Sequence, residues 1–537
     1  MDKILILDFG SQTTALIGRR IREAGVYAEI VAGDSPLDGA GSGGSPLDGA
    51  RGIILSGSPE SVYASGIAPD KRVYECGLPL LGICYGLQRM TADLGGLVSA
   101  LPKWEYGGVE VRIRYPEAVP SHVKPFLEAF GGVESFTAWM SHGDTLTKLA
   151  PGFIECGTSA SGFPAVLAHE FNSWFGLQFH PELTHTRFGS EILSAFVFGI
   201  CGCAKSWTME AYLDEAVDKI RRRVGDNPVL LLISGGVDSA VAGALLLRAL
   251  DADSVHFMYM DTGLMRKNET SLVKRSLEQL GARHLHIVHC EDEFFTALSG
   301  ISAPEDKRKI IGDLFITIQE RELARLGLSA SYFLAQGTLY TDLIESGKGV
   351  GNSAHLIKSH HNVGSPLVAA KRQAGRLIEP LDALYKDEAR ALGRLLGLDE
   401  LIVGRHPFPG PGLAVRIPGE VTREKCEILR EADAVFINEL RKRRTADGSK
   451  SLYDDIWQAF VVLLPVRSVG VAGDARKYGW VAALRAVTSA DGMSAGVYPF
   501  APKDLIEIST LITNNVESIG RVTYDISSKP PATIEWE

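Results

Sequence analysis

A glycine-rich turn between two apolar runs constrains the fold of this chain more than any other feature. Residues 229–233 read Val-Leu-Leu-Leu-Ile, residues 234–239 read Ser-Gly-Gly-Val-Asp-Ser, and a second apolar stretch covers 240–250. Short apolar runs bounded by glycines predict a buried strand that passes through a tight turn into a helix. Units of this kind build the parallel sheets of α/β proteins, so the sequence predicts an α/β fold.

The same turn has the chemistry of a phosphate-binding loop. Glycines allow backbone N–H groups to approach an anion, serine hydroxyls add donors, and a helix N-terminus carries partial positive charge. Such a turn also joins a strand to a helix without any ligand in many proteins, so this signal is weak when taken alone. Asp238 and Ser239 stand where a Walker loop carries lysine followed by serine or threonine, which argues against an ordinary kinase or GTPase.

The turn resembles the nucleotide-binding loop of the ATP pyrophosphatases, which cleave ATP between its α and β phosphates and place AMP on a substrate. Because Asp238 is the nearest carboxylate, it is the candidate ligand for the Mg²⁺ that would bridge the phosphate oxygens. The resemblance implies that ATP is a co-substrate bound by the loop residues Ser234, Gly235, Gly236, Val237, Asp238, Ser239 and Ala240.

Length and charge limit the classes to which the chain can belong. At 537 residues it is too long for one hydrophobic core, and about three domains are expected. A net charge of −10 argues against a nucleic-acid partner. The seven cysteines are scattered, which predicts a cytoplasmic location, and no apolar run approaches the ~20 residues that span a bilayer, so no membrane partner is expected.

Alternating strand and helix patterns predict two consecutive α/β domains and a smaller third domain. In the first domain, residues 1–203, short β-rich runs alternate with helical stretches, and the same alternation returns in the second, residues 207–404. Prolines interleaved with glycines then break the pattern and lead into a third segment, 405–537, that mixes strands and helices. The predicted fold is therefore two doubly wound, mostly parallel-sheet domains followed by an α+β domain.

A cysteine in the first domain has the surroundings of a nucleophile. Gly82-Ile83-Cys84-Tyr85-Gly86 follows a predicted strand and precedes a predicted helix, as in a nucleophile elbow with cysteine in place of serine. A helix N-terminus favours thiolate over thiol. Far downstream, His180 follows another predicted strand and can take the proton of Cys84, while Glu182 can hold the imidazole tautomer. The alternative is an ordinary buried cysteine after a strand.

This region resembles the class I glutamine amidotransferases, which hydrolyse glutamine to glutamate and ammonia. The resemblance implies a catalytic triad of Cys84, His180 and Glu182, with the backbone amides of Gly57 and Tyr85 as the oxyanion hole. The family usually has Gly-Gly-Pro where this chain has Gly-Ser-Pro at 57–59. The residues that match the family's glutamine-binding positions are Gln88, Ser141, His142 and Gly143.

The rest of the chain contains six further motifs, at 261–269, 307–312, 335–338, 357–363, 406–412 and 521–537. These motifs resemble the GMP synthetase family, which aminates XMP with ATP and ammonia. These motifs are long, and with the amidotransferase region the resemblance covers nearly the whole chain. It implies a product, GMP, formed when ammonia displaces AMP from an XMP adenylylated at the purine C2 oxygen.

The same resemblance implies further site residues. Lys358 matches a phosphate contact, and Asp342, Glu345, His360 and His361 match a lid that closes over ATP. Arg308, Lys529 and Glu535 match contacts to XMP, for which a basic side chain suits the phosphate and a carboxylate suits the purine N–H groups. In this family the third domain pairs two subunits, so a homodimer is expected.

Less specific interpretations stay open at this point. The run 307–309 reads Lys-Arg-Lys and could be a solvated helix face, and His360-His361 could be a polar turn. The enzyme could act on another acceptor, as an NAD synthetase does, although the terminal segment 529–537 argues against this. A nucleotide-sensing protein without catalysis is a third possibility, but all three triad positions hold competent residues.

Overall fold

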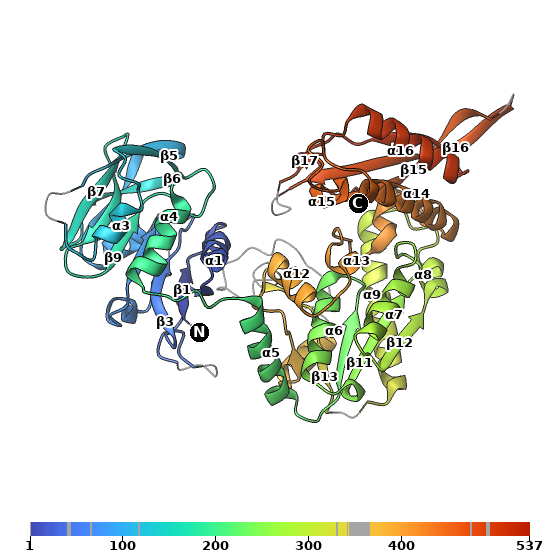
Figure 1. The fold of residues 1–537 in the computed structure, drawn as a ribbon, viewed down its shortest axis with the longest axis horizontal. Coiled ribbons are helices and arrows are strands. Elements are labelled where there is room, and N and C mark those ends of the chain that lie inside the picture. Colours follow the sequence, from blue (N-terminus) through green and yellow to red (C-terminus); the bar gives the residue numbers. More distant parts are fainter. Residues whose placement is uncertain are drawn as a thin grey trace. The chain divides into compact units, whose positions relative to one another are not determined.

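The computed structural model describes residues 2–39, 44–64, 67–115, 119–328, 331–340, 342, 366–472, 475–489 and 494–537. By their contacts these residues separate into two compact units, which divide between Tyr212 and Leu213 (Figure 1). The division falls within helix α5, Met209–Val224. Each unit is therefore described by itself.

The first unit is built on a nine-stranded sheet of order β2-β1-β3-β4-β9-β8-β7-β5-β6. Its first five strands are parallel, and from β9 onward every pair is antiparallel. The parallel strands are β1 Lys3–Asp8, β2 Tyr27–Ala32, β3 Ala50–Leu55, β4 Leu80–Ile83 and β9 Trp174–Leu177. The others are β5 Leu97–Ile113, β6 Ser135–Lys148, β7 Phe153–Ser159 and β8 Pro164–His169.

Hydrophobic cores cover both faces of the parallel half of this sheet. In β1, Ile4 and Ile6 belong to one core while Leu5 and Leu7 belong to the other, because successive side chains of a strand point to opposite faces. Burial on both faces explains why these strands read as continuous apolar runs. The helical segments of the unit are α1 Thr14–Glu23, η1 Lys71–Tyr74, α2 Tyr85–Asp93, α3 Lys124–Glu128, α4 Gly189–Ser194 and η2 Ala195–Ile200.

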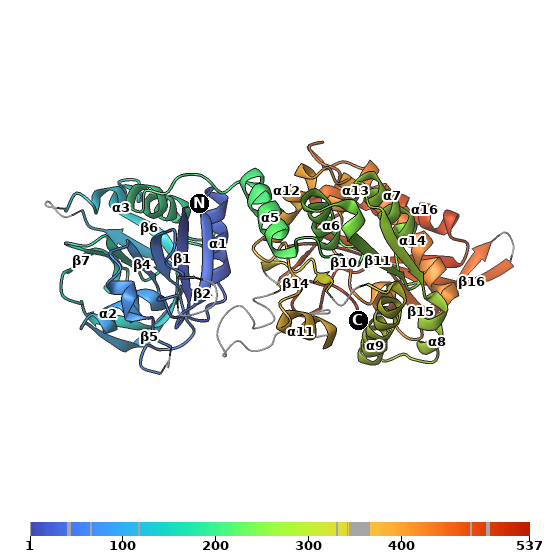
Figure 2. The same ribbon diagram turned by 90° about the horizontal axis from the view of Figure 1, so that it is seen from below.

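The second unit contains a wholly parallel five-stranded sheet of order β12-β11-β10-β13-β14. The chain leaves β10 through α6, which packs on β10 and β11 (Figures 1 and 2), and later returns to the other side of β10 as β13. Ligands bind beyond the carboxyl ends of the strands at such a switch in strand order. The strands are β10 Val229–Ile233, β11 Val255–Asp261, β12 His284–His289, β13 Phe333–Ala335 and β14 Leu377–Ile378.

Helices pack around this sheet in the order that the sequence pattern predicted. Helix α9 covers Pro304–Leu326. The other helical segments are α6 Val237–Ala249, η3 Ala252–Ser254, α7 Glu269–Gln279, α8 Glu291–Ala297, α11 Pro366–Gln373, α12 Lys386–Leu395 and α13 Glu400–Val403.

The C-terminal part of the second unit is an α+β layer on a four-stranded sheet. In this sheet β15 Gln458–Ala472 and β17 Gly496–Val497 run antiparallel to β16 Ala475–Thr488, and β18 Ile519–Tyr524 runs parallel to it. The helical segments are η4 Gly412–Arg416, α14 Arg423–Lys442, α15 Leu452–Asp455 and α16 Pro502–Asn515.

The parallel sheet and the α+β layer share a hydrophobic core. Met260 and Leu298 from the former pack with Leu413 and Leu463 from the latter in one cluster. The predicted fold class is confirmed: two α/β sheets, the first with a parallel and an antiparallel half and the second wholly parallel, are followed by a smaller α+β region. Within the described residues, the structure contains no helix with the length and apolarity needed to cross a membrane.

Candidate active sites

Cys84 lies on a strained turn between strand β4 and helix α2. Its backbone has φ 52° and ψ −107°, a conformation that residues other than glycine rarely adopt. The two flanking glycines are required by close approach, because a Cβ atom on Gly82 would lie 2.7 Å from the Leu87 nitrogen and one on Gly86 would lie 2.2 Å from the Leu55 oxygen. The structure therefore has the geometry of a nucleophile elbow, as the sequence pattern predicted.

The structure brings the predicted partners of Cys84 together. His180 hydrogen-bonds to the Cys84 thiol, and its Nδ1 lies 2.7 Å from the Glu182 Oε1 atom. Gly57 borders the same imidazole, since a Cβ atom there would lie 3.2 Å from His180 Cε1. Burial is the largest effect on the pKa of His180 and lowers it, but the Glu182 carboxylate and the Cys84 hydrogen bond outweigh burial and hold this pKa well above its usual value. The Glu182 carboxylate therefore favours a protonated His180 imidazole beside the Cys84 sulfur.

The state of this pair can be tested with Glu182→Gln. Removal of the carboxylate removes the main interaction that raises the pKa of His180, so burial should lower this pKa and the imidazolium should be lost at pH 7. We expect the rate of Cys84 alkylation by iodoacetamide at pH 7 to fall about ten-fold or more, because the positively charged imidazolium next to the sulfur is lost.

The half-buried Cys76 gives an internal reference for this measurement. Both thiols can be followed in one sample by peptide mass spectrometry. An unchanged ratio of Cys84 to Cys76 alkylation at pH 7 would show that Glu182 does not control the imidazole.

The predicted glutamine-binding residues surround the nucleophile. The Ser141 carbonyl lies 3.7 Å from Cys84 Sγ. Gln88 Nε2 donates to the Asp144 carbonyl at 2.9 Å, and His142 Nδ1 donates to the same oxygen at 2.8 Å. The backbone at Gly143 faces the Trp104 indole, whose Nε1 would lie 3.1 Å from an added Cβ. All four predicted positions therefore lie in one place in the fold.

Gln178, which was not predicted as a site residue, also contacts the nucleophile. Its Nε2 donates to Cys84 Sγ at 3.8 Å, and its Oε1 accepts from Gln88 Nε2 at 3.4 Å. The side chain is 1% exposed. A signal was present in the sequence, because Gln178 lies two residues before His180 in a stretch that reads as a strand, where alternate side chains share a face.

The predicted phosphate loop connects β10 to α6. Gly235 has φ +78°, a backbone conformation that glycine adopts without strain. Ser234 Oγ lies 3.2 Å from Ser239 Oγ and accepts from the Gly236 N–H at 3.3 Å, so the two serines bridge the turn. Val237 begins α6, followed by Asp238 and Ala240 in its first turn. The loop thus presents backbone N–H groups and a helix N-terminus at the carboxyl edge of the sheet.

Neighbouring motifs hold this loop in place. Arg405 Nη1 donates to the Gly235 carbonyl at 2.6 Å and to Glu269 Oε1 at 2.9 Å. Gly337 packs directly on the loop, because an added Cβ would lie 2.8 Å from the Asp238 carbonyl carbon. Arg405, Glu269 and Gly337 are far apart in the sequence but lie together at the phosphate loop.

Asp238, the predicted metal ligand, has one paired and one unpaired oxygen. Its Oδ2 accepts from Lys386 Nζ. Its Oδ1 is buried and has no hydrogen-bond partner within the described part of the chain. Lys386 was not assigned from the sequence, where a single lysine at the start of a helix gives no signal.

Most of the predicted lid and the predicted phosphate contact lie outside the residues that the structure describes. Lys358, Glu345, His360 and His361 are outside the described residues. Asp342 is described, and it is half-buried and helical.

Arg308 contacts the end of the sequence. Its Nη2 donates to the Glu537 carbonyl at 2.5 Å. The adjacent Lys307 is fully buried, pairs with the Glu537 carboxylate at 2.5 Å and donates to the Ile417 carbonyl at 2.8 Å. The interpretation of 307–309 as a solvated helix face is therefore wrong for Lys307, which joins α9 to the terminal segment.

The other predicted XMP residues belong to the terminal segment. Arg416 donates two hydrogen bonds to the Glu535 carboxylate at 2.9 and 3.1 Å, and Gln458 Nε2 donates to its Oε1 at 2.7 Å. Lys529 lines a surface pocket, and its N–H donates to the Ala495 carbonyl at 2.8 Å. Arg416 and Gln458 were not predicted as site residues, because they lie outside the sequence motifs.

Comparisons with known proteins agree with this geometry. The model of class-I glutamine amidotransferase matches residues 5–200, that of asparagine synthase matches 208–311, and that of the GMP synthase C terminal domain matches 447–536. The glutamine-hydrolyzing GMP synthase of Aquifex aeolicus is 47% identical over 99% of this chain and 99% of its own. The chain belongs to the glutamine-hydrolysing GMP synthase family.

Other relatives carry the same name. The glutamine-hydrolyzing GMP synthase of Stenotrophomonas maltophilia is 48% identical to this chain, and the match covers 100% of this chain and 99% of the relative. That of Bradyrhizobium diazoefficiens is 47% identical and covers 100% of this chain and 93% of its own. The resemblance to the GMP synthase family that the motifs indicated is confirmed, and the chain is an enzyme of the glutamine-dependent ligase class. Neither an NAD synthetase nor a binding protein without catalysis is supported.

Proposed function

We propose that this chain makes GMP from XMP with two sites of distinct chemistry. Glutamine is hydrolysed at Cys84, XMP is adenylylated at its C2 oxygen by ATP, and ammonia displaces AMP. The elbow geometry at Cys84, in a chain that matches the family over its full length, is the observation that carries the proposal. Glutamate and pyrophosphate are the co-products.

At the first site, the Cys84 thiolate attacks the glutamine amide carbon. The backbone amides of Gly57 and Tyr85 stabilise the resulting oxyanion. His180 gives its proton to the leaving ammonia and later takes one from the water that releases glutamate, while Glu182 keeps the imidazole oriented. Gln178 donates to the sulfur and holds it in line for attack.

At the second site, the loop 234–239 holds the pyrophosphate portion of ATP with its N–H groups and serines. The buried, unpartnered Oδ1 of Asp238 fits a Mg²⁺ ligand. Mg²⁺ bound there would neutralise charge that grows on the phosphate oxygens. Lys386 orients the Asp238 carboxylate, and Lys358 contacts the phosphates. The lid residues Asp342, Glu345, His360 and His361 keep water from the adenylylated XMP.

For XMP we infer contacts from Arg308 and Lys529 to the phosphate and from Glu535 to the purine. The charge and hydrogen-bonding capacity of these side chains support this assignment. We also propose a homodimer formed through 405–537, where Val466, Val469, Val471 and Tyr478 are exposed on the β15–β16 hairpin. Domain boundaries near 203 and 405 and a cytoplasmic location are part of the same proposal, and the seven free cysteines support the location.

A reaction assay tests the proposal. Purified protein with XMP, Mg²⁺, ATP and glutamine should yield GMP, AMP, pyrophosphate and glutamate in equal amounts, measured by ion-exchange chromatography. Formation of ADP and phosphate instead would contradict an adenylylated intermediate. Amination of nicotinic acid adenine dinucleotide in place of XMP would identify a different acceptor.

A further inference from the structure

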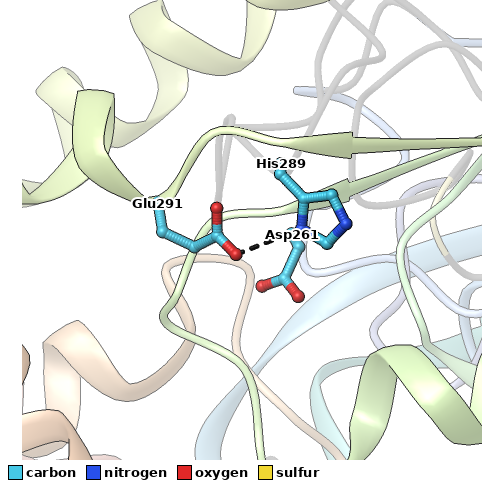
Figure 3. A group of neighbouring side chains, drawn as sticks. All are labelled: Asp261, His289 and Glu291. Carbon is cyan, nitrogen blue, oxygen red and sulfur yellow. Dashed lines mark hydrogen bonds and ion pairs between the residues drawn. The ribbon is translucent and has the colours of Figure 1, made fainter.

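Three side chains with metal-ligand chemistry lie together at the ends of two neighbouring strands (Figure 3). Asp261 ends β11, His289 ends β12 and Glu291 begins α8. One ligand atom from each lies within 4.8 Å of the other two. Asp261 and His289 are partners in the parallel ladder, so their side chains leave the sheet on the same face. The cluster is therefore fixed by strand register rather than by chance contact.

Two hydrogen bonds hold the carboxylate of Asp261 in position. It accepts from the Gly263 N–H at 3.1 Å and from Thr270 Oγ1 at 2.6 Å. Carboxylates that bind metals in proteins are usually held by hydrogen bonds of this type. His289 is freer to adjust, because its side chain is 66% exposed, whereas that of Glu291 is 27% exposed. Small rotations of these two side chains can bring all three ligand atoms onto one ion.

Within the described residues the cluster has no lysine or arginine counter-ion, and His289 Nδ1 lies 3.2 Å from Glu291 Oε1. In the described part of the chain, neither Asp261 nor Glu291 forms an ion pair with lysine or arginine. The next two carboxylates along α8 do, because Asp292 pairs with Arg423 at 2.6 Å and Glu293 with Arg321 at 2.8 Å. The two carboxylates that lack a cationic partner are those that face the exposed imidazole. A bound cation would neutralise these two carboxylates.

We propose that Asp261, His289 and Glu291 bind a divalent transition-metal ion of the Zn²⁺ class, at a site separate from the Mg²⁺ ligand proposed at Asp238. One imidazole nitrogen and two carboxylate oxygens suit Zn²⁺ and its first-row neighbours, whereas Mg²⁺ and Ca²⁺ prefer ligands that are all oxygen. The ion would join the ends of β11 and β12 to the start of α8. Thr270, which holds Asp261, is next to Glu269, which supports the phosphate loop through Arg405. A bound ion would thus stabilise the edge of the sheet at which the nucleotide is proposed to bind.

Metal titration of the full chain tests this site. A Cys84→Ala background removes the catalytic thiolate, which could itself bind Zn²⁺, and excess Mg²⁺ occupies sites that are all oxygen. Under these conditions we expect one Zn²⁺ per chain, measured by competition with a chromophoric chelator and by isothermal titration. Zn²⁺ should also raise the melting temperature, because it binds the folded state. His289→Ala and Glu291→Gln should each weaken binding about ten-fold or more.

His284→Ala is the matched control. His284 lies on the same strand and stacks on His256 with ring centroids 4.6 Å apart, and His286 lies against His256 as well. This imidazole stack is the alternative site for the same ion. If the ion binds instead to Asp261, His289 and Glu291, His284→Ala should leave Zn²⁺ affinity unchanged. Loss of binding in His284→Ala with unchanged binding in His289→Ala would assign the ion to the stack and overturn the proposal. Absence of stoichiometric binding would overturn it too, whatever the outcome of the GMP assay.

Discussion

Replacement of Cys84 by alanine should abolish GMP formation from glutamine and leave GMP formation from ammonium intact. Without the sulfur no thioester forms, so we expect glutamine-dependent activity to fall by about 10³-fold or more. Ammonium supplied in solution can still attack the adenylylated XMP, because the phosphate loop belongs to the other compact unit. GMP formation with each nitrogen source, followed by chromatography, measures both activities in one preparation.

The control for this experiment is Cys76→Ala, which removes a half-buried thiol of the same unit outside the triad. It should leave both activities unchanged. If Cys84→Ala lost the ammonium reaction while remaining folded by circular dichroism, the division of the reaction between two sites would be wrong. If it kept the glutamine reaction, Cys84 would not be the nucleophile.

Local sequence pattern predicted the parts of the fold in which chain neighbours determine the geometry. The elbow at Cys84 follows from glycines on both sides of one cysteine, and each glycine is required by a contact of its own. The loop at 234–239 follows from a buried strand that passes into a helix. Both motifs need only a few adjacent residues to define their shape.

The antiparallel half of the first sheet was not foreseen in detail. Strand β5 is 17 residues long and pairs with β6 on one side and β7 on the other. It alternates polar and apolar residues with glycines, a pattern that single-sequence reasoning cannot assign to a particular neighbour. The mixed sheet depends on pairings between distant segments.

The burial of charged side chains could not be predicted from the sequence either. Lys307 stands in a basic run that reads as a solvated helix face, yet it is fully buried against Glu537, 230 residues away. Arg416 is 1% exposed and packs its guanidinium over Phe460 at 4.1 Å while it holds Glu535. A buried cation is stable only with a partner, and the partner in each case comes from the far end of the chain.

Gly337→Ala should disable the synthetase site without altering the glutaminase site. A Cβ atom at this position would lie 2.8 Å from the carbonyl carbon of Asp238, 2.8 Å from the nitrogen of Ser239 and 2.9 Å from the Asp238 oxygen. All three are backbone atoms that cannot rotate away, so the phosphate loop itself must shift. Since a displacement of ~1 Å can cost about 10²-fold in rate, we expect ammonium-dependent GMP formation to fall by roughly that factor.

Gly312→Ala provides the matched control, because an added Cβ there meets no atom within 4 Å and the residue lies inside helix α9. Alanine in a helix is more favourable than glycine by roughly 0.5–1 kcal/mol, so this variant should be as stable as the parent or more so. The alkylation rate of Cys84 should be the same in both variants, since Cys84 lies in the other unit. Full ammonium-dependent activity in Gly337→Ala would mean that the loop tolerates displacement, and the phosphate-binding role proposed for it would be wrong. A loss confined to this variant would place ATP on the loop, because the two variants add the same methyl group and differ only in what it meets.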